Sequence, residues 1–158
     1  MLIKLIDNIR HKSIRKKTAS RKAAIQILYV HQFNDQPLFE SISIFETYYK
    51  KFLLNNLEIK ELDVKLLDDL LKNFDENKYV YDSIIKNNLS NDWKIERLGK
   101  NELNILRLSV FELKFFKKFD KKTIINEYVS IFNNFCGEAD FASGFLNNVL
   151  KSEQLNNG

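Results

Sequence analysis

The chain has 158 residues, with 25 lysine and arginine side chains against 21 aspartate and glutamate side chains. This length suits one domain with a real hydrophobic core, and a single proline, four glycines and abundant leucine, isoleucine and lysine favour helices over sheets. No apolar run is long enough to span a membrane, and residues 1–7 are too short and mixed for a signal peptide. The lone Cys136 excludes an internal disulfide and suits a reducing cytoplasm.

Basic residues are concentrated at the N-terminal end. Residues 1–22 carry eight basic side chains and one acidic side chain, Asp7, so their net charge is +7 and the remaining residues sum to −3. This distribution is typical of a protein with a polyanionic partner, although a solvated, frayed terminus would also produce it. We expect residues 1–14 to form a basic extension that need not be ordered, followed by a helical domain at 15–153.

Apolar residues recur at helical spacing along most of the chain. Turn-forming residues at 34–37 and 90–92 interrupt the pattern, and residues 93–98 form a short apolar turn. The segment at 101–118 is apolar almost all round, so we expect it in the middle of a bundle. The fold class is therefore predicted as all-α, a compact single-domain bundle of about seven helices at 17–32, 38–53, 59–74, 77–88, 101–118, 121–135 and 141–153.

The first of these helices carries a mixed polar stripe. When it is continued back at about 100° per residue, five polar or aromatic side chains fall on one face. Single-stranded RNA is recognised by such a mixture of cations for phosphates, polar groups for base edges and a ring for stacking. Solvation alone would also place lysine and glutamine there, and the tyrosine could belong to the rim of the core. The stripe consists of Arg15, Thr18, Lys22, Gln26 and Tyr29.

Arg107 lies in the apolar helix at 101–118, close to Leu103 and Phe111. A partly buried arginine needs a carboxylate partner. Glu112 projects from a different side of the same helix, so we expect the partner to be Glu127, at the edge of the apolar face of the following helix. A solvent-exposed position on the lysine-bearing stripe of its helix is the other interpretation.

Four segments together resemble the NusB family of bacterial transcription antitermination factors. Residues 20–32 (SRKAAIQILYVHQ) are similar to an arginine-led A-x-Q-x-L-Y helix, and residues 95–113 (IERLGKNELNILRLSVFEL) to R-L-x-x-x-(D/E)-x-x-I-L-R-x-A-x-Y-E-L. Residues 124–129 (IINEYV) and 144–150 (GFLNNVL) resemble V-A-I-N-E-A-V and F-V-N-G-V-L. The resemblance covers about 15–151 and is weak over 33–90.

The chain departs from the family pattern at three places. Thr18, Ala19 and Ser20 stand in part of the usual arginine run, Asp120 replaces a helix-opening proline, and Asn148 replaces a glycine. An aspartate can cap a helix N-terminus, so we expect the helix after Asp120 to persist. At its far end, Gly137 is expected to end this helix and Asp140 to cap the next.

The resemblance implies a NusB-like bundle whose first helix binds RNA. Arg21, Gln26 and Tyr29 match the family by position, whereas the cations at 15–17 match only in charge. The family binds the boxA element of ribosomal RNA operon transcripts together with NusE, a small-subunit ribosomal protein, and acts on elongating RNA polymerase. The expected RNA-binding residues are Arg15, Lys16, Lys17, Thr18, Arg21, Lys22, Gln26 and Tyr29.

Two residues are candidates for contact with the protein partner. Glu102 projects away from Arg107, although a carboxylate favoured by the helix dipole is an equally good interpretation. Asn126 falls on a polar helix face, where core packing does not explain it. Structural roles are expected for Arg107, Glu112, Glu127 and Asn147.

Catalysis finds little support in the sequence. There is no HExxH, CxxC, GxSxG or glycine-rich phosphate loop, and Cys136 has no histidine near it in sequence. We therefore expect a non-enzyme without metal or cofactor. One alternative is a non-catalytic module related to the N-terminal domain of ribosomal RNA cytosine methyltransferases, whose catalytic domain would not fit in 158 residues. Another is a plain helical protein-interaction module with a basic tail.

Overall fold

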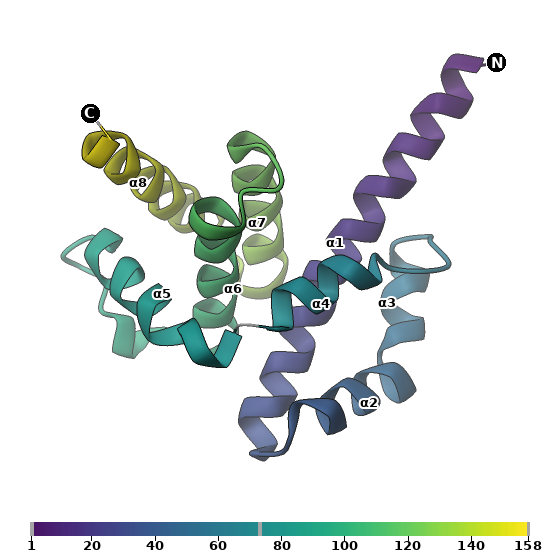
Figure 1. Cartoon of the computed structure of the whole chain (residues 1–158), viewed down its shortest axis with the longest axis horizontal. Coiled ribbons are helices and arrows are strands. Elements are labelled where there is room, and N and C mark those ends of the chain that lie inside the picture. Colours follow the sequence, from purple (N-terminus) through teal and green to yellow (C-terminus); the bar gives the residue numbers. More distant parts are fainter. Residues whose placement is uncertain (1, 73, 158) are drawn as a thin grey trace. The chain divides into compact units, whose positions relative to one another are not determined.

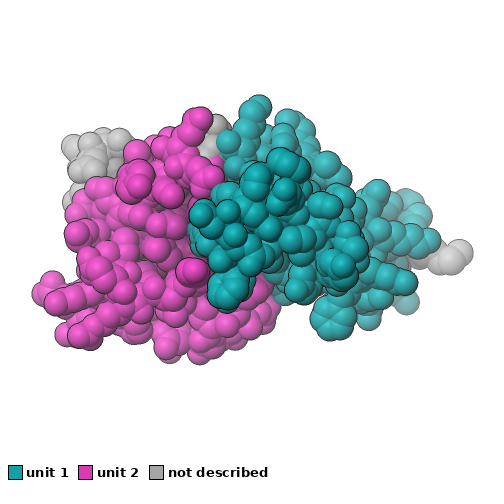
Figure 2. All heavy atoms as spheres, turned by 90° about the horizontal axis from the view of Figure 1, so that it is seen from below, with its two compact units in different colours: residues 1–73 teal, residues 74–158 magenta. Residues whose placement is uncertain are grey.

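The structure, a computed structural model, describes residues 2–72 and 74–157, with side chains as far as Ser152. It forms two compact units, residues 1–73 and residues 74–158, coloured teal and magenta in Figure 2. The described residues contain eight α-helices and no strand, which confirms the all-α prediction (Figure 1). The single domain expected from the sequence stays a prediction. None of the described helices is both long and apolar enough to cross a membrane.

Unit 1 is built on one long helix. Helices α2 (Leu38–Tyr48), α3 (Lys50–Asn56) and α4 (Val64–Lys72) all pack against α1 (Leu2–Asn34). Alanines on α1 are completely buried and allow this close packing. The helix ends where Asp35 adopts a left-handed backbone conformation with φ of 49°, just before the proline that opens α2.

Helix α1 is longer than the sequence predicted. It begins at Leu2 instead of residue 17, because no glycine or proline lies in the first sixteen residues to stop it. The side chains at 2–14 are all exposed, and these N-terminal turns project beyond α2, α3 and α4 (Figure 1).

Two further predicted boundaries in unit 1 were wrong. The helix predicted at 38–53 is two helices, separated at Tyr49, whose φ of −121° departs from helical values. The helix predicted at 59–74 begins only at Val64. Here the carboxylate of Asp63 accepts a hydrogen bond of 3.0 Å from the backbone N–H of Leu66, which is the geometry of an N-cap.

Unit 2 is arranged around α6 (Lys100–Val110). This helix packs against α5 (Phe74–Asn88), α7 (Lys121–Cys136) and α8 (Ala139–Asn157), as its nearly all-round apolar character predicted. A 3-10 turn, η1 (Ile95–Arg97), precedes it. The predicted single helix at 101–118 instead changes after Val110 into a π-helix, η2 (Phe111–Phe116).

The ends of α7 follow the capping signals in the sequence. Asp120 accepts hydrogen bonds from the backbone N–H of Thr123 at 2.8 Å and from its hydroxyl at 2.7 Å. These bonds favour the charged carboxylate and hold the pKa of Asp120 below its usual range. Gly137 ends α7 with a φ of 74°, as predicted. The prediction for Asp140 was wrong, because α8 begins at Ala139 and Asp140 lies within its first turn.

Candidate nucleic-acid interface

The polar stripe predicted on α1 lies on a continuous helix. Thr18, Lys22 and Gln26 are half-buried along it, as is Arg15 at its N-terminal end. Arg15 Nε and Gln26 Oε1 are buried atoms that have no hydrogen-bond partner within the described structure. The hydroxyl of Thr18 donates to the backbone oxygen of Ile14 at 3.1 Å. Two polar atoms of the stripe are therefore left without a partner within the described structure.

An exposed aromatic pair forms the C-terminal end of this stripe. The rings of Tyr29 and Phe33 stack with centroids 5.9 Å apart and an interplanar angle of 15°. Both rings are exposed, so they form a platform on which a nucleobase could stack. Sequence reasoning missed Phe33, although its spacing of four residues from Tyr29 placed it on the same face.

Arg21, which belongs to the predicted RNA-binding set, is buried. Its side chain belongs to the buried face of α1 and is only 2% exposed, so it cannot reach a phosphate without leaving the protein interior. The helical projection had not placed Arg21 on the stripe, and only the match to the family pattern had suggested an RNA contact. The neighbouring Ser20 is also buried, and its hydroxyl donates to the backbone oxygen of Asp63 at 2.6 Å.

The cations at 16 and 17 precede this buried stretch. Lys16 Nζ lies 3.1 Å from Glu61 Oε1, which belongs to the loop between α3 and α4. Both side chains are partly solvated, so the pair contributes little to stability. Lys17 is half-buried. The pair shows that the α3–α4 loop lies beside the basic segment of α1.

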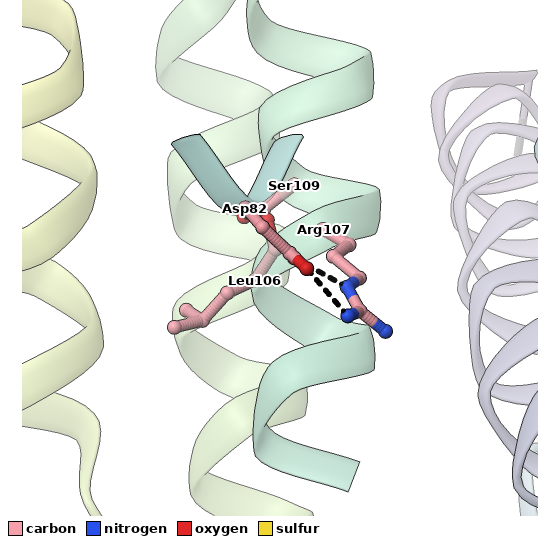
Figure 3. Close-up of polar contacts among 4 residues, drawn as sticks. All are labelled: Asp82, Leu106, Arg107 and Ser109. Atoms are coloured by element: carbon pink, nitrogen blue, oxygen red, sulfur yellow. Dashed lines mark hydrogen bonds and ion pairs between the residues drawn. The ribbon is translucent and has the colours of Figure 1, made fainter. Parts of the chain in front are cut away.

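Arg107 has a carboxylate partner, but not the predicted one. Its Nε and Nη2 donate to the two carboxylate oxygens of Asp82 on α5, at 2.6 and 2.8 Å (Figure 3). Its guanidinium also lies 5.8 Å from the ring centroid of Phe74. The prediction of Glu127 was wrong because Arg107 faces α5 and not α7. The structural ion pair expected for Arg107 is present with a different partner.

Glu112 and Asn147 make different kinds of contact. Glu112, in the first turn of the π-helix, is 1% exposed and accepts a hydrogen bond from the hydroxyl of Tyr128 on α7. This bond joins two segments of unit 2, which is a structural role. Asn147 is exposed, and its amide donates to the backbone oxygen of Ser143 at 2.8 Å, so this contact stays within α8.

The two candidates for protein contact differ in exposure. Asn126 is exposed on α7. Glu102 is half-buried, and its carboxylate accepts a long hydrogen bond of 3.4 Å from the backbone N–H of Gly99, ahead of α6. This bond supports the interpretation of Glu102 as a helix-start carboxylate and leaves contact with a partner as a prediction.

Glu102 also acts on the only cysteine of the chain. The pKa of Cys136 is raised to about 11, mainly by burial of the thiol and further by the negative charges of Glu102 and Glu138. Because only the thiolate is nucleophilic, we expect the rate of alkylation by iodoacetamide to keep rising with pH beyond 9, where an ordinary thiol levels off. Mass spectrometry of the alkylated protein would give the rate at each pH.

Glu102→Gln should lower this pKa and speed alkylation at pH 8, while Glu96→Gln, an equivalent change at an exposed carboxylate, should not. A rate that levels off near pH 9 in the unmodified chain would contradict the raised pKa.

Comparison with known proteins decides the family. The model of the NusB family matches residues 18–154. This chain belongs to the NusB family. Transcription antitermination protein NusB of Clostridium botulinum (strain Loch Maree) is 33% identical over 135 residues, which cover 83% of this chain and 94% of that protein. The protein of the same name from Novosphingobium aromaticivorans is 30% identical, covering 87% of this chain and 94% of its own.

A solved structure of the family is also similar. The crystal structure of the antitermination factors NusB and NusE in complex with dsRNA contains a chain that is 26% identical, with a TM-score of 0.65. The match covers 87% of this chain and 98% of that chain. The expected NusB-like fold is thereby confirmed, and the N-terminal turns of α1 before Thr18 lie outside the family match.

Proposed function

We propose that this protein is an RNA-binding transcription antitermination factor that acts together with a NusE-type ribosomal protein. The observation that carries the proposal is the α1 stripe, which combines cations, an amide and an exposed aromatic pair on one helix. Membership of the NusB family supports it, since relatives are transcription antitermination proteins and one family structure contains NusE and RNA.

Each part of the stripe has a distinct chemical role in this proposal. Arg15 and Lys22 neutralise phosphates, and Gln26 meets a base edge with its amide. Tyr29 and Phe33 supply a stacking surface at one end. The burial of Arg21 favours a role for its side chain within the protein over direct contact with RNA.

The resemblance to the family supplies the finer assignments. The RNA is the boxA element of nascent ribosomal RNA transcripts, and the assembled complex acts on elongating RNA polymerase in the cytoplasm without catalysing a reaction. One stripe with few base contacts binds RNA weakly and discriminates poorly, so a second protein is needed for specific recognition. Glu102 and Asn126 are its proposed contacts on unit 2.

The proposal predicts how binding responds to substitutions on the stripe. Lys22→Glu should weaken binding to a boxA-like RNA and reduce the salt dependence, by a slope of roughly 0.7 for each lost phosphate contact. Tyr29→Ala should cost about 1–3 kcal/mol of binding free energy if a base stacks on its ring. Fluorescence anisotropy with labelled RNA measures both effects, and NusE should increase the preference for this RNA over a scrambled one.

Lys72→Glu is the matched control, because Lys72 is an exposed residue of α4 and the change in charge is the same. Circular dichroism should show native helicity for every variant. If Lys22→Glu and Tyr29→Ala bind as tightly as the unmodified chain, the stripe does not contact RNA. Equal affinity for the boxA-like and scrambled RNAs in the presence of NusE would refute the specific role.

A further inference from the structure

Unit 1 contains a basic hollow that the α1 stripe does not include. Its volume is about 340 Å³, and it lies between the end of α2, α3 and the loop that follows α3. Lys50, Lys51 and Lys60 line it, with Glu46 as the single acidic residue in its wall. We call this hollow the α3 pocket.

The positive charge of the α3 pocket is only partly compensated within the protein. Among the residues that the structure describes, Lys50, Lys51 and Lys60 have no ion-pair or hydrogen-bond partner. Three cations and one carboxylate around a hollow produce a locally positive potential, which favours an anionic ligand.

Exposed aromatic side chains accompany these lysines in the sequence. Tyr48 and Tyr49 immediately precede Lys50, and Phe52 follows Lys51. Tyr48 is 73% exposed and Phe52 is 72% exposed, so the packing of the protein does not account for either ring. Cations interleaved with exposed rings are the combination that binds single-stranded nucleic acid, through phosphates and stacked bases. A partner that offered only phosphate or acidic groups to the lysines would not explain the exposed rings.

The α3 pocket is connected to the basic segment of α1. Lys60 directly precedes Glu61, whose carboxylate lies 3.1 Å from Lys16 Nζ. The backbone N–H of Asp63 also donates to the backbone oxygen of Lys16 at 3.3 Å. These two contacts place the loop that carries Lys60 beside α1, next to the cations at 15–17.

We propose that the α3 pocket is a second contact for single-stranded RNA, which extends the RNA-binding surface beyond the α1 stripe. Lys50, Lys51 and Lys60 neutralise phosphates of nucleotides that flank the segment on α1, and Phe52 stacks on one of their bases. This inference rests on the proposed RNA-binding function and adds a surface made by α3 and the α3–α4 loop.

The test compares a short boxA-like RNA with the same RNA carrying an unstructured polyuridine tail at its 5′ or 3′ end. The unmodified chain should bind one of the tailed RNAs more tightly than the short one. A Lys51→Glu and Lys60→Glu double variant should lose this gain, with a salt slope reduced by roughly 0.7 for each lost phosphate contact. Phe52→Ala should weaken binding of the tailed RNA by roughly 5- to 150-fold. All variants should bind the short RNA normally.

Lys72→Glu again provides the control for a change of charge outside the pocket, and it should preserve the gain from the tail. The inference is overturned, with the proposed function intact, if the short RNA binds but neither tail increases affinity. It is equally overturned if the pocket variants keep the gain, or if Lys72→Glu abolishes it as well. Absence of binding to any of these RNAs, with or without NusE, would overturn both the inference and the proposed function.

Discussion

Replacing Arg107 with methionine is expected to lower the free energy of unfolding by about 3 kcal/mol. The change removes both hydrogen bonds to Asp82 and leaves its carboxylate in a partly buried site without its cation. The side chain of Arg107 is 12% exposed and that of Asp82 is 26% exposed. Because Asp82 keeps some contact with water, the cost should fall at the lower end of the range for buried pairs. Urea unfolding followed by the fluorescence of the single tryptophan, Trp93, in unit 2 measures it.

A double-mutant cycle identifies the partner. Arg107→Met combined with Asp82→Asn should show a clear coupling energy, because each substitution removes the same interaction. The matched cycle with Glu127→Gln, on α7, should be additive. Additivity in the first cycle would show that the ion pair does not stabilise the protein, and coupling in the second would restore the partner that the sequence predicted.

The error over Arg107 shows what helical periodicity can predict. The pattern on α6 correctly placed Arg107 at the edge of an apolar helix, where a carboxylate is required. It could not say which neighbouring helix would supply that carboxylate, because a projection gives directions around one helix and no information about packing. Asp82 lies on α5, in the part of the chain where the resemblance to the family was weakest.

Local capping signals predicted helix boundaries better than periodicity predicted contacts between helices. Asp120 caps the start of α7 and Gly137 ends it, as predicted, since capping depends on residues within one turn of each helix terminus. The cap at Asp63 was equally local but was overlooked, and α4 was consequently predicted to start too early. The π-helix after Val110 had no sequence signal that we recognised.

The candidate RNA surface was predicted only where it lies on one helix. The α1 stripe follows from spacing alone, while Arg21, which only the match to the family pattern had added, is buried. The α3 pocket joins Lys50 and Lys51 to Lys60, and no periodicity relates a helix to the loop after it. Such a surface becomes visible only when the packing of α3 and its loop against α1 is known.

Tyr128→Phe is expected to lower the free energy of unfolding by about 1.5–3 kcal/mol, the range for a hydrogen bond to a charged group. The hydroxyl of Tyr128 donates to the carboxylate of Glu112, and both side chains are 1% exposed. Removing the hydroxyl takes away one donor from a carboxylate that water does not reach, while the ring still fills its place in the core. Urea unfolding followed by Trp93 fluorescence again measures the loss.

Tyr79→Phe is the matched control, since it deletes the same hydroxyl from a tyrosine that is 76% exposed. Its effect should stay within about 0.5 kcal/mol, as for other surface substitutions. At low urea concentration, where the Tyr128→Phe variant is folded, its affinity for a boxA-like RNA should be unchanged, because the hydroxyl of Tyr128 is buried and is not part of the α1 stripe. Equal stability of the two variants would mean that the bond to Glu112 contributes no net stability. Loss of RNA affinity in the folded Tyr128→Phe variant would instead assign this buried contact a part in RNA binding.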